Sequence, residues 1–501
     1  MEPPMHRPTR PLRPLVFTLA VLALALSAAA QPLDIVIEQL RIKGKLGTSK
    51  IGYVVVDVQT GEELAAYNHD QLYIPASNQK LLTSIAALSV LGPEFLFETN
   101  IMYDMKDNIV VIRGSGDPAF GDPKLLQEMG ISVEEFTSTL AQSMLDAGVT
   151  AGAEVVIDDR IFDREFVHPT WPKGQLNRWY CAEVAGLAFH TNTLSIFAKP
   201  QRSGAPPLIS LEPDASWIEI DPRKSRSVNS GRHTLWAARQ HMTNNISLRG
   251  DARHASTPVE VTIHDPPLFF GTLIAQEMER AGITPKNIRR AEEAEQFENA
   301  RTILPIQTKL RTILERTNTD SQNLYAESLL KRIGHEITSE PGSWQNGSTV
   351  VRMVVRERAG AVSGKDFIIA DGSGMSRENR ATPETLTRLL VSCARDTTVF
   401  KPLLESLATP GRGTLKTRFT STRDSLHGQV YAKSGYLKGV SALSGYVVDD
   451  RTGRVVAFSI ILNNVPSSVA RTWVKEFEEG IVRATDEHLF SGEPARVLGA
   501  R

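Results

Sequence analysis

The chain has 501 residues, of which 41% are hydrophobic and 23% are charged, a balance typical of a soluble globular protein. This length predicts about three units of domain size, since a domain averages roughly 150 residues. The formal net charge of -1 at pH 7 gives no electrostatic reason to expect nucleic acid or an anionic membrane surface as a partner.

The first 30 residues have the pattern of a secretory signal peptide. Three arginines precede an apolar run over residues 15–26, and small residues follow up to Ala30. This run is shorter than the ~20 residues that a transmembrane helix needs. We therefore expect cleavage after Ala30 and a mature chain in the periplasm or cell wall, with no stable membrane span.

A hairpin and an apolar helix come next. Residues 51–58 and 64–67 are β-rich runs that flank a turn. Residues 81–88 are rich in alanine and leucine, which predicts a helix that begins after a proline-containing loop. Ser77 and Lys80 lie three residues apart at its start, so they share one face of the helix.

The following part of the chain has a different texture. Short β-like runs are separated by turns rich in proline, glycine and aspartate. We expect residues 101–305 to form a β-rich inserted region made of two nested subdomains. The runs lie at residues 109–113, 155–158, 208–211, 246–248 and 259–263.

Helices and strands of the first kind return after the insertion. Residues 321–323 open an amphipathic helix, and residues 429–432 form a strand-like run. Residues 440–448 and 455–462 flank a turn and predict a second hairpin, and residues 467–485 predict a helix that packs on the sheet. The apolar stripe of this helix consists of Val469, Trp473, Phe477 and Ile481.

Strands near both chain ends predict one discontinuous α/β (α+β) domain. Residues 31–100 and 306–501 would supply an antiparallel sheet flanked by helices, and the inserted region would interrupt them.

Three short motifs carry the chemistry. A serine at a helix start, with a lysine one turn later that burial can turn into a base, is the arrangement of an activated nucleophile. The spacing alone is weak, because Ser328 and Lys331 repeat it within an amphipathic helix, where we expect a solvated lysine. Two further motifs follow Ser77 and Lys80 in order, Ser321-Gln322-Asn323 and Lys433-Ser434-Gly435.

This order is similar to the triple signature of active-site-serine penicillin-binding proteins and serine β-lactamases. The long separation of Ser77 from Ser321 resembles the low-molecular-mass class C penicillin-binding proteins, the D-alanyl-D-alanine carboxypeptidases and endopeptidases of peptidase family S13. The resemblance implies the penicillin-binding/β-lactamase-like transpeptidase fold. Residues 114–118, 180–187, 371–377 and 411–415 also resemble stretches of that family.

The resemblance implies a peptidase that acts on peptidoglycan stem peptides and is acylated by β-lactams. Ser77 would attack the carbonyl of the penultimate D-alanine, and Lys80 would take its proton. Ser321 would relay a proton to the leaving nitrogen, and Asn323 would hydrogen-bond Lys80 or the substrate. Lys433 would keep the site positive and lower the pKa of Lys80 by charge repulsion.

The third motif departs from the lysine-threonine-glycine-threonine that the family usually has. Ser434 keeps the hydroxyl that would bind the substrate carboxylate, and Gly435 is retained. The backbone N–H groups of Ser77 and Tyr436 would form the oxyanion hole. Tyr436 has a ring in place of the hydroxyl of the family's second threonine. This change makes an internal cross-link, or a different terminal residue, more plausible as the substrate.

Two alternative functions stay open: a related hydrolase of other D-amino-acid peptides, and a catalytically silent protein that binds wall components or protein partners. We expect no cofactor and no metal, since histidine-glutamate-x-x-histidine and paired-cysteine spacings are absent from the sequence. Cys181 and Cys393 allow one disulfide, but their small and apolar neighbours favour two buried free thiols.

Overall fold

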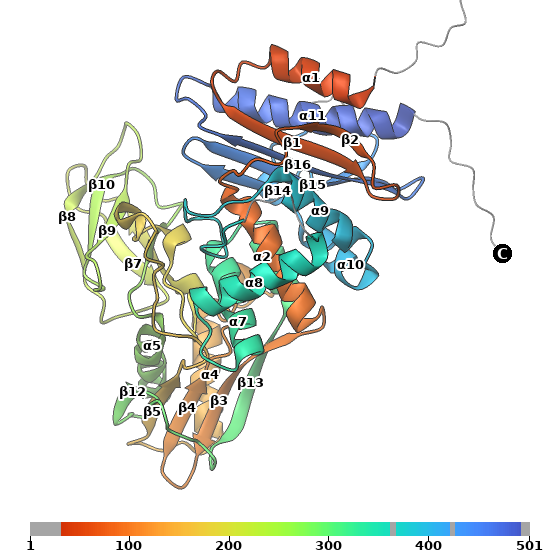
Figure 1. Ribbon diagram of the computed structural model, residues 1–501. Coiled ribbons are helices and arrows are strands. Elements are labelled where there is room, and N and C mark those ends of the chain that lie inside the picture. Colours follow the sequence, from red (N-terminus) through yellow and green to blue (C-terminus); the bar gives the residue numbers. More distant parts are fainter. Residues whose placement is uncertain (1–31, 361–366, 421–425, 492–501) are drawn as a thin grey trace, which may run out of the picture.

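A five-stranded antiparallel sheet joins the two ends of the chain in the computed structural model, which describes residues 32–360, 367–420 and 426–491 (Figure 1). The strand order is β14-β15-β16-β1-β2, and Lys50 lies opposite Asn463 where the N-terminal and C-terminal parts pair. The expected signal peptide lies outside the described residues. The strands are β1 (Lys50–Asp57), β2 (Glu63–Tyr67), β14 (Gln429–Leu437), β15 (Val440–Asp449) and β16 (Arg454–Asn463).

Helices cover both faces of this sheet, as the sequence predicted. On one face α1 (Leu33–Lys43) and α11 (Arg471–Ser491) lie side by side (Figure 1). The other face packs against α9, which contacts β1 and β16, and the remaining helices form a bundle beneath it. That bundle consists of α2 (Gln79–Leu91), α6 (Leu310–Asn318), α7 (Asn323–Thr338), α8 (Trp344–Ala359), α9 (Pro383–Ala394) and α10 (Thr397–Ser406).

The central helix α2 and the C-terminal helix α11 differ in how much of their surface is buried. α2 is buried on all sides from Gln79 to Leu88, which makes it the central helix of the bundle. α11 begins at Arg471, four residues later than expected, because Pro466 and the turn after it occupy the predicted first turn. Phe477 and Ile481 are buried as predicted, but Trp473 is 36% exposed, and Val474 takes the inward position.

Residues 96–309 form three further sheets. The largest is a mixed sheet with strand order β12-β5-β4-β3-β13, in which β5 pairs in parallel with β4 and with β12. Its strands are β3 (Leu96–Asp104), β4 (Ile109–Arg113), β5 (Glu154–Asp158), β12 (Asn287–Arg290) and β13 (Arg301–Lys309). The sequence analysis did not anticipate its helices, which are α3 (Pro123–Glu128), α4 (Val133–Asp146) and α5 (Pro266–Arg280).

Two three-stranded sheets complete this region, with strand orders β11-β6-β7 and β8-β10-β9. They enclose a small apolar core of their own. Their strands are β6 (Thr193–Lys199), β7 (Leu208–Glu212), β8 (Ile220–Ser227), β9 (Trp236–Arg239), β10 (Ile246–Ala252) and β11 (Val259–Thr262). The described residues also contain five short 3-10 turns, namely η1 (Ala76–Asn78), η2 (Lys173–Gln175), η3 (Trp179–Cys181), η4 (His190–Asn192) and η5 (Gly413–Leu415).

We propose that these sheets are the predicted insertion, nested in the catalytic unit. β3 leaves α2 and β13 leads into α6, and the two strands pair antiparallel with Leu96 opposite Lys309. The chain therefore departs and returns at the same place, between the helix of the first motif and the approach to the second. Within the described residues, no helix is long and apolar enough to cross a membrane.

Candidate active site

Ser77 lies in the 3-10 turn η1, directly before α2. The residue before it, Ala76, adopts the left-handed conformation with φ of 47°, so the chain turns sharply at this point. Gly374, itself at φ +86°, lies so close to the carbonyl of Ala76 that an added Cβ would come within 1.8 Å of the oxygen. The site therefore requires glycine at this position to keep the serine turn in place.

Lys80 lies one turn further on and is fully buried. Its Nζ atom is 3.3 Å from Ser77 Oγ, 2.7 Å from Asn323 Oδ1 and 2.8 Å from the carbonyl oxygen of Ser373. Burial lowers the pKa of Lys80 to about 7, against nearby carboxylates that act to raise it. In a large fraction of molecules, Lys80 is therefore the free amine near neutral pH.

The second motif lies at the entrance to α7. Ser321, at φ 63°, precedes the helix in the left-handed region, and Asn323 is its first residue. The Asn323 side chain accepts from Lys80 and donates through Nδ2 to the carbonyl of Tyr180, 2.8 Å away. Its amide orientation is thereby fixed, with oxygen toward the lysine.

The third motif lies on the edge strand β14, which runs alongside η1. Lys433 Nζ donates to Ser321 Oγ and to the carbonyl of Ser434, each at 2.8 Å. Burial lowers the pKa of Lys433 well below its usual range, and the charge of Lys80 lowers it further. The expected cause for Lys80 therefore differs: burial is the main factor there, and the repulsion between the two lysines acts on Lys433.

Close packing holds this strand against the serine turn. A Cβ on Gly435 would lie 3.1 Å from the backbone nitrogen of Ser77 and 3.0 Å from the carbonyl of Pro75. The buried amide of Asn78 bridges the same two elements: its nitrogen can donate to the carbonyl of Lys433 at 2.8 Å, and its oxygen lies 2.6 Å from Ser444 Oγ. The three motifs thus meet around one short segment of chain.

An open cleft lies beside Ser77 and Ser321. It has a volume of about 300 Å³ and is bounded by Ser434 and Tyr436 on the strand side. Tyr436 is 53% exposed, so its ring stands in the cleft and not in the core. A substrate can therefore approach the serine from solvent along the edge of β14.

A buried carboxylate that the sequence analysis missed supports the site. Glu327 lies one turn after Asn323 and accepts from the backbone N–H groups of Gly372 and Ser373 at 2.9 and 2.8 Å. Trp344 Nε1 donates to it at 2.9 Å. Burial raises the pKa of Glu327 to about 7, and the neighbouring carboxylate of Asp371 contributes to the increase.

Glu327 positions the loop whose Ser373 carbonyl binds Lys80. Asp371 stabilises the same loop, because it accepts from the N–H of Gly374 at 2.8 Å and from Asn379 Nδ2 at 2.7 Å. The sequence does contain a signal for Glu327, an acid within the apolar run that follows Asn323, but its spacing matches no motif.

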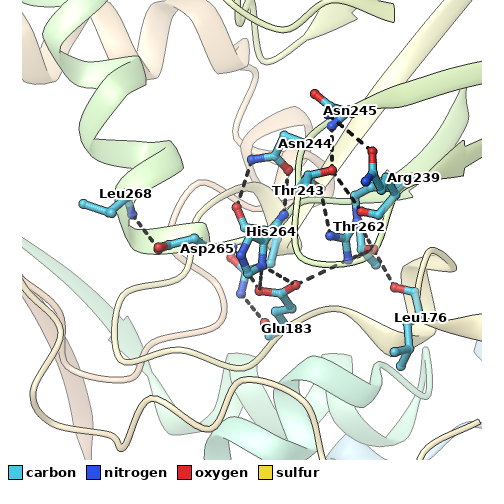
Figure 2. Close-up of polar contacts among 12 residues, drawn as sticks. Leu176, Glu183, Arg239, Thr243, Asn244, Asn245, Thr262, His264, Asp265 and Leu268 are labelled. Carbon is cyan, nitrogen blue, oxygen red and sulfur yellow. Dashed lines mark hydrogen bonds and ion pairs between the residues drawn. The ribbon is translucent and has the colours of Figure 1, made fainter. Parts of the chain in front are cut away.

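A polar cluster in residues 96–309 fixes the segment that holds Asn323 (Figure 2). Glu183 is buried and accepts from Arg239 at 3.3 Å and from the backbone N–H of Asp265 at 2.9 Å. The Nδ1 atom of His264 lies 3.1 Å from the same carboxylate. Tyr180, whose carbonyl binds Asn323, lies three residues before Glu183, so this cluster connects the smaller sheets to the active site.

The second serine–lysine pair has a structural role. Ser328 and Lys331 are both buried on α7, which corrects the expectation of a solvated lysine. Lys331 lies 2.6 Å from a carboxylate oxygen of Asp163 and 3.9 Å from the centre of the Trp344 ring, so it is paired with a carboxylate contributed by residues 96–309. The amphipathic spacing predicted the helix α7, but it did not predict that the face with Ser328 and Lys331 would be buried.

Neither cysteine is one of the groups that meet at the site. Cys181 and Cys393 are buried free thiols, and burial raises the pKa of each to about 12. Among the described residues, no group of three or more histidine, cysteine, aspartate or glutamate side chains is arranged to hold a metal ion.

Comparisons with known proteins support the resemblance to peptidase family S13. A D-alanyl-D-alanine carboxypeptidase of Actinomadura sp. (strain R39) is 29% identical over 91% of this chain and 86% of its own length. The D-alanyl-D-alanine carboxypeptidase DacB of Haemophilus influenzae is 22% identical over 86% of this chain and 90% of its own.

Solved structures show the same fold. The crystal structure of penicillin-binding protein 4 (dacB) from Haemophilus influenzae matches with a TM-score of 0.72 at 21% identity, over 90% of this chain and 99% of that chain. A predatory peptidoglycan endopeptidase from Bdellovibrio bacteriovorus matches with a TM-score of 0.50 at 15% identity, over 88% and 93%. The model of the D-Ala-D-Ala carboxypeptidase 3 (S13) family matches residues 33–486, and the chain belongs to this family.

Proposed function

We propose that this protein is a serine-type D-alanyl-D-alanine carboxypeptidase or endopeptidase. It cleaves peptidoglycan stem peptides through an acyl-enzyme on Ser77 and is inhibited by penicillin. The observation that carries the proposal is the hydrogen bonding of Lys80. A free amine has two N–H donors, and here Asn323 Oδ1 and the Ser373 carbonyl, at 2.7 and 2.8 Å, can accept both. The lone pair then remains for the hydroxyl of Ser77, 3.3 Å away.

Acylation follows from this arrangement. The Ser77 hydroxyl gives its proton to Lys80 Nζ while its oxygen bonds to the carbonyl carbon of the penultimate D-alanine. The backbone N–H groups of Ser77 and Tyr436 stabilise the negative oxygen that results. When the C–N bond breaks, the leaving amine takes up the proton that Lys80 accepted, relayed through the Ser321 hydroxyl, and Lys80 becomes the free amine again.

Lys433 supports that transfer. It donates to Ser321 Oγ at 2.8 Å, which orients the hydroxyl and stabilises it as its proton departs. Ser434 offers its hydroxyl to the substrate carboxylate. Water then attacks the ester carbon and gives a proton to Lys80. The ester C–O bond breaks, Lys80 returns that proton to Ser77 Oγ, and the shortened peptide leaves.

β-Lactams are the expected covalent inhibitors, because their strained amide takes the place of the D-alanyl-D-alanine bond. Penicillin-binding protein 4 of Haemophilus influenzae has been crystallised with a β-lactam. We expect the chain to work where peptidoglycan is found, in the periplasm or cell wall, after removal of its leader.

A labelled-penicillin gel tests the proposal. The mature chain should be labelled covalently, Ser77→Ala should abolish the label, and Ser138→Ala, a change of the same kind on the exposed surface of α4, should not. Mass spectrometry of a stem pentapeptide and of cross-linked muropeptide dimers then separates the two activities, by release of D-alanine or by cleavage of the dimer. A wild-type protein that is neither labelled nor active on either substrate would refute the proposal.

A further inference from the structure

The cleft beside Ser77 has a strongly basic wall contributed by α11 and the segment after η5. Arg418, Arg471 and Lys475 line it, together with one acid, Glu478. These cations face the same space as the hydroxyl of Ser434. The wall therefore lies next to the place where the leaving residue of a substrate would stand.

The three basic residues differ in how far their charge is already neutralised. Arg418 is buried and lies 3.0 Å from a carboxylate oxygen of Glu478 and 2.9 Å from one of Glu479. Within the described residues, Arg471 and Lys475 form no ion pair. The charge available to a ligand in this cleft is therefore that of Arg471 and Lys475.

Tyr436 fixes the position of Arg471. The guanidinium carbon of Arg471 lies 3.9 Å from the centre of the Tyr436 ring, a distance at which a cation is attracted to an aromatic face. A threonine at position 436 has no ring and could not make this contact. A guanidinium held over a ring by this contact can still direct two N–H donors at the oxygens of a carboxylate.

We propose that Arg471, held by Tyr436, is the specificity residue that binds the free carboxylate of the D-residue on the leaving side of the scissile bond. Tyr436 thus replaces a lost hydroxyl by positioning a cation. The inference rests on the proposed function and narrows its substrate class to D,D-peptide bonds followed by a free carboxylate. That carboxylate comes from a terminal D-alanine or from the acceptor D-centre of a cross-link.

The test compares each substrate with its amidated form. The mature chain is given diacetyl-L-lysyl-D-alanyl-D-alanine or its C-terminal amide, and cross-linked muropeptide dimers whose acceptor carboxylate is free or amidated. Arg471→Met should raise KM about tenfold for the acid forms, the scale of a lost hydrogen bond to a charged group, and change KM little for the amides. Arg471→Lys should fall between, and Tyr436→Leu should reduce the preference for the acid in the same direction.

Arg223→Met is the matched control, since the side chain of Arg223 is 86% exposed on the distant strand β8. It should leave the ratio of acid to amide unchanged. The substrate on which Arg471→Met has the larger effect, the terminal D-alanine peptide or the cross-linked dimer, identifies the natural leaving group. An unchanged ratio in Arg471→Met, with an active wild type, overturns this inference alone, whereas a wild type that penicillin does not label and that cleaves neither substrate refutes the proposed function and the inference with it.

Discussion

A carboxylate placed beside Lys80 should convert the general base into a cation. Asn323→Asp puts a negative charge where Asn323 Oδ1 now lies, 2.7 Å from Lys80 Nζ. An opposite charge at such a distance favours the charged form of a lysine and raises its pKa by about 1 to 3 units. Starting from about 7 in the wild type, the pKa of Lys80 should therefore move to between about 8 and 10.

The size of the effect on acylation follows from the fraction of free amine. With a pKa of about 7, half of the Lys80 side chains are neutral at pH 7, whereas an ordinary lysine would be neutral in roughly one molecule in 2,500. In Asn323→Asp the neutral fraction falls to between about one in ten and one in a thousand, so acylation at pH 7 should slow by about 5- to 500-fold. At pH 10 most of the loss should be recovered.

The assay is the second-order rate of acylation by a fluorescent penicillin, quenched and resolved on gels from pH 5 to pH 10. The wild-type rate should fall tenfold per unit below pH 7 and level off above pH 8, since only the free amine accepts the proton. Asn323→Ala loses the same hydrogen bonds without adding charge. The pH below which its acylation rate falls should therefore be the same as, or lower than, that of the wild type. Two results would refute the assignment of Lys80 as the base. One is a rate in Asn323→Asp that falls at the same pH as in the wild type, and the other is a loss of rate at pH 10 as large as that at pH 7.

Three other predictions address the surroundings of the site. Gly374→Ala should unfold the site or abolish labelling, because the added methyl comes within 1.8 Å of the carbonyl before the nucleophile and strains the positive φ; circular dichroism and a penicillin gel would show it, and normal labelling would contradict it. Arg239→Met leaves Glu183 buried beside one partner fewer, so urea denaturation should show a loss of about 3 to 5 kcal/mol, and the double change with Glu183→Gln should recover part of it. Cys181 and Cys393 should resist Ellman's reagent at pH 8 until urea unfolds the chain, since burial raises both pKa values to about 12; rapid reaction in the native state would show that they are accessible.

The candidate catalytic groups could be proposed from the sequence because their spacing is set by local geometry. A base one helical turn after a serine must be three or four residues away, so Ser77 and Lys80 identify each other in the sequence. Two further motifs were found by their order and type. The antiparallel sheet also followed from hairpins whose strands alternate with turns near both chain ends, and the family and structural comparisons confirm the fold.

The missed residues act through contacts between distant segments. Glu327 has its effect because a loop some forty-five positions later folds back onto it, and that return is not encoded in any local period. Arg471 meets Tyr436 only because α11 packs over the end of β14. The helix α4 is a different case, since Ser132 and Glu135 form a capping box that the sequence already displays within a region otherwise marked by β-like runs.

The proposed insertion lies in the chain between the segments that carry the first and second motifs. It leaves after the helix that carries Lys80 and returns before Ser321, through two strands that pair with each other. It also reaches back, because the carbonyl of Tyr180 is the acceptor that fixes the orientation of the Asn323 amide. A flipped Asn323 amide would direct its N–H groups at Lys80. These groups would disfavour the cationic form of Lys80 more than the free amine, and they would provide no hydrogen-bond acceptor for either form. The segment around Tyr180 and the cluster at Glu183 therefore affect the proposed role of Lys80 as a base, although neither contacts Ser77.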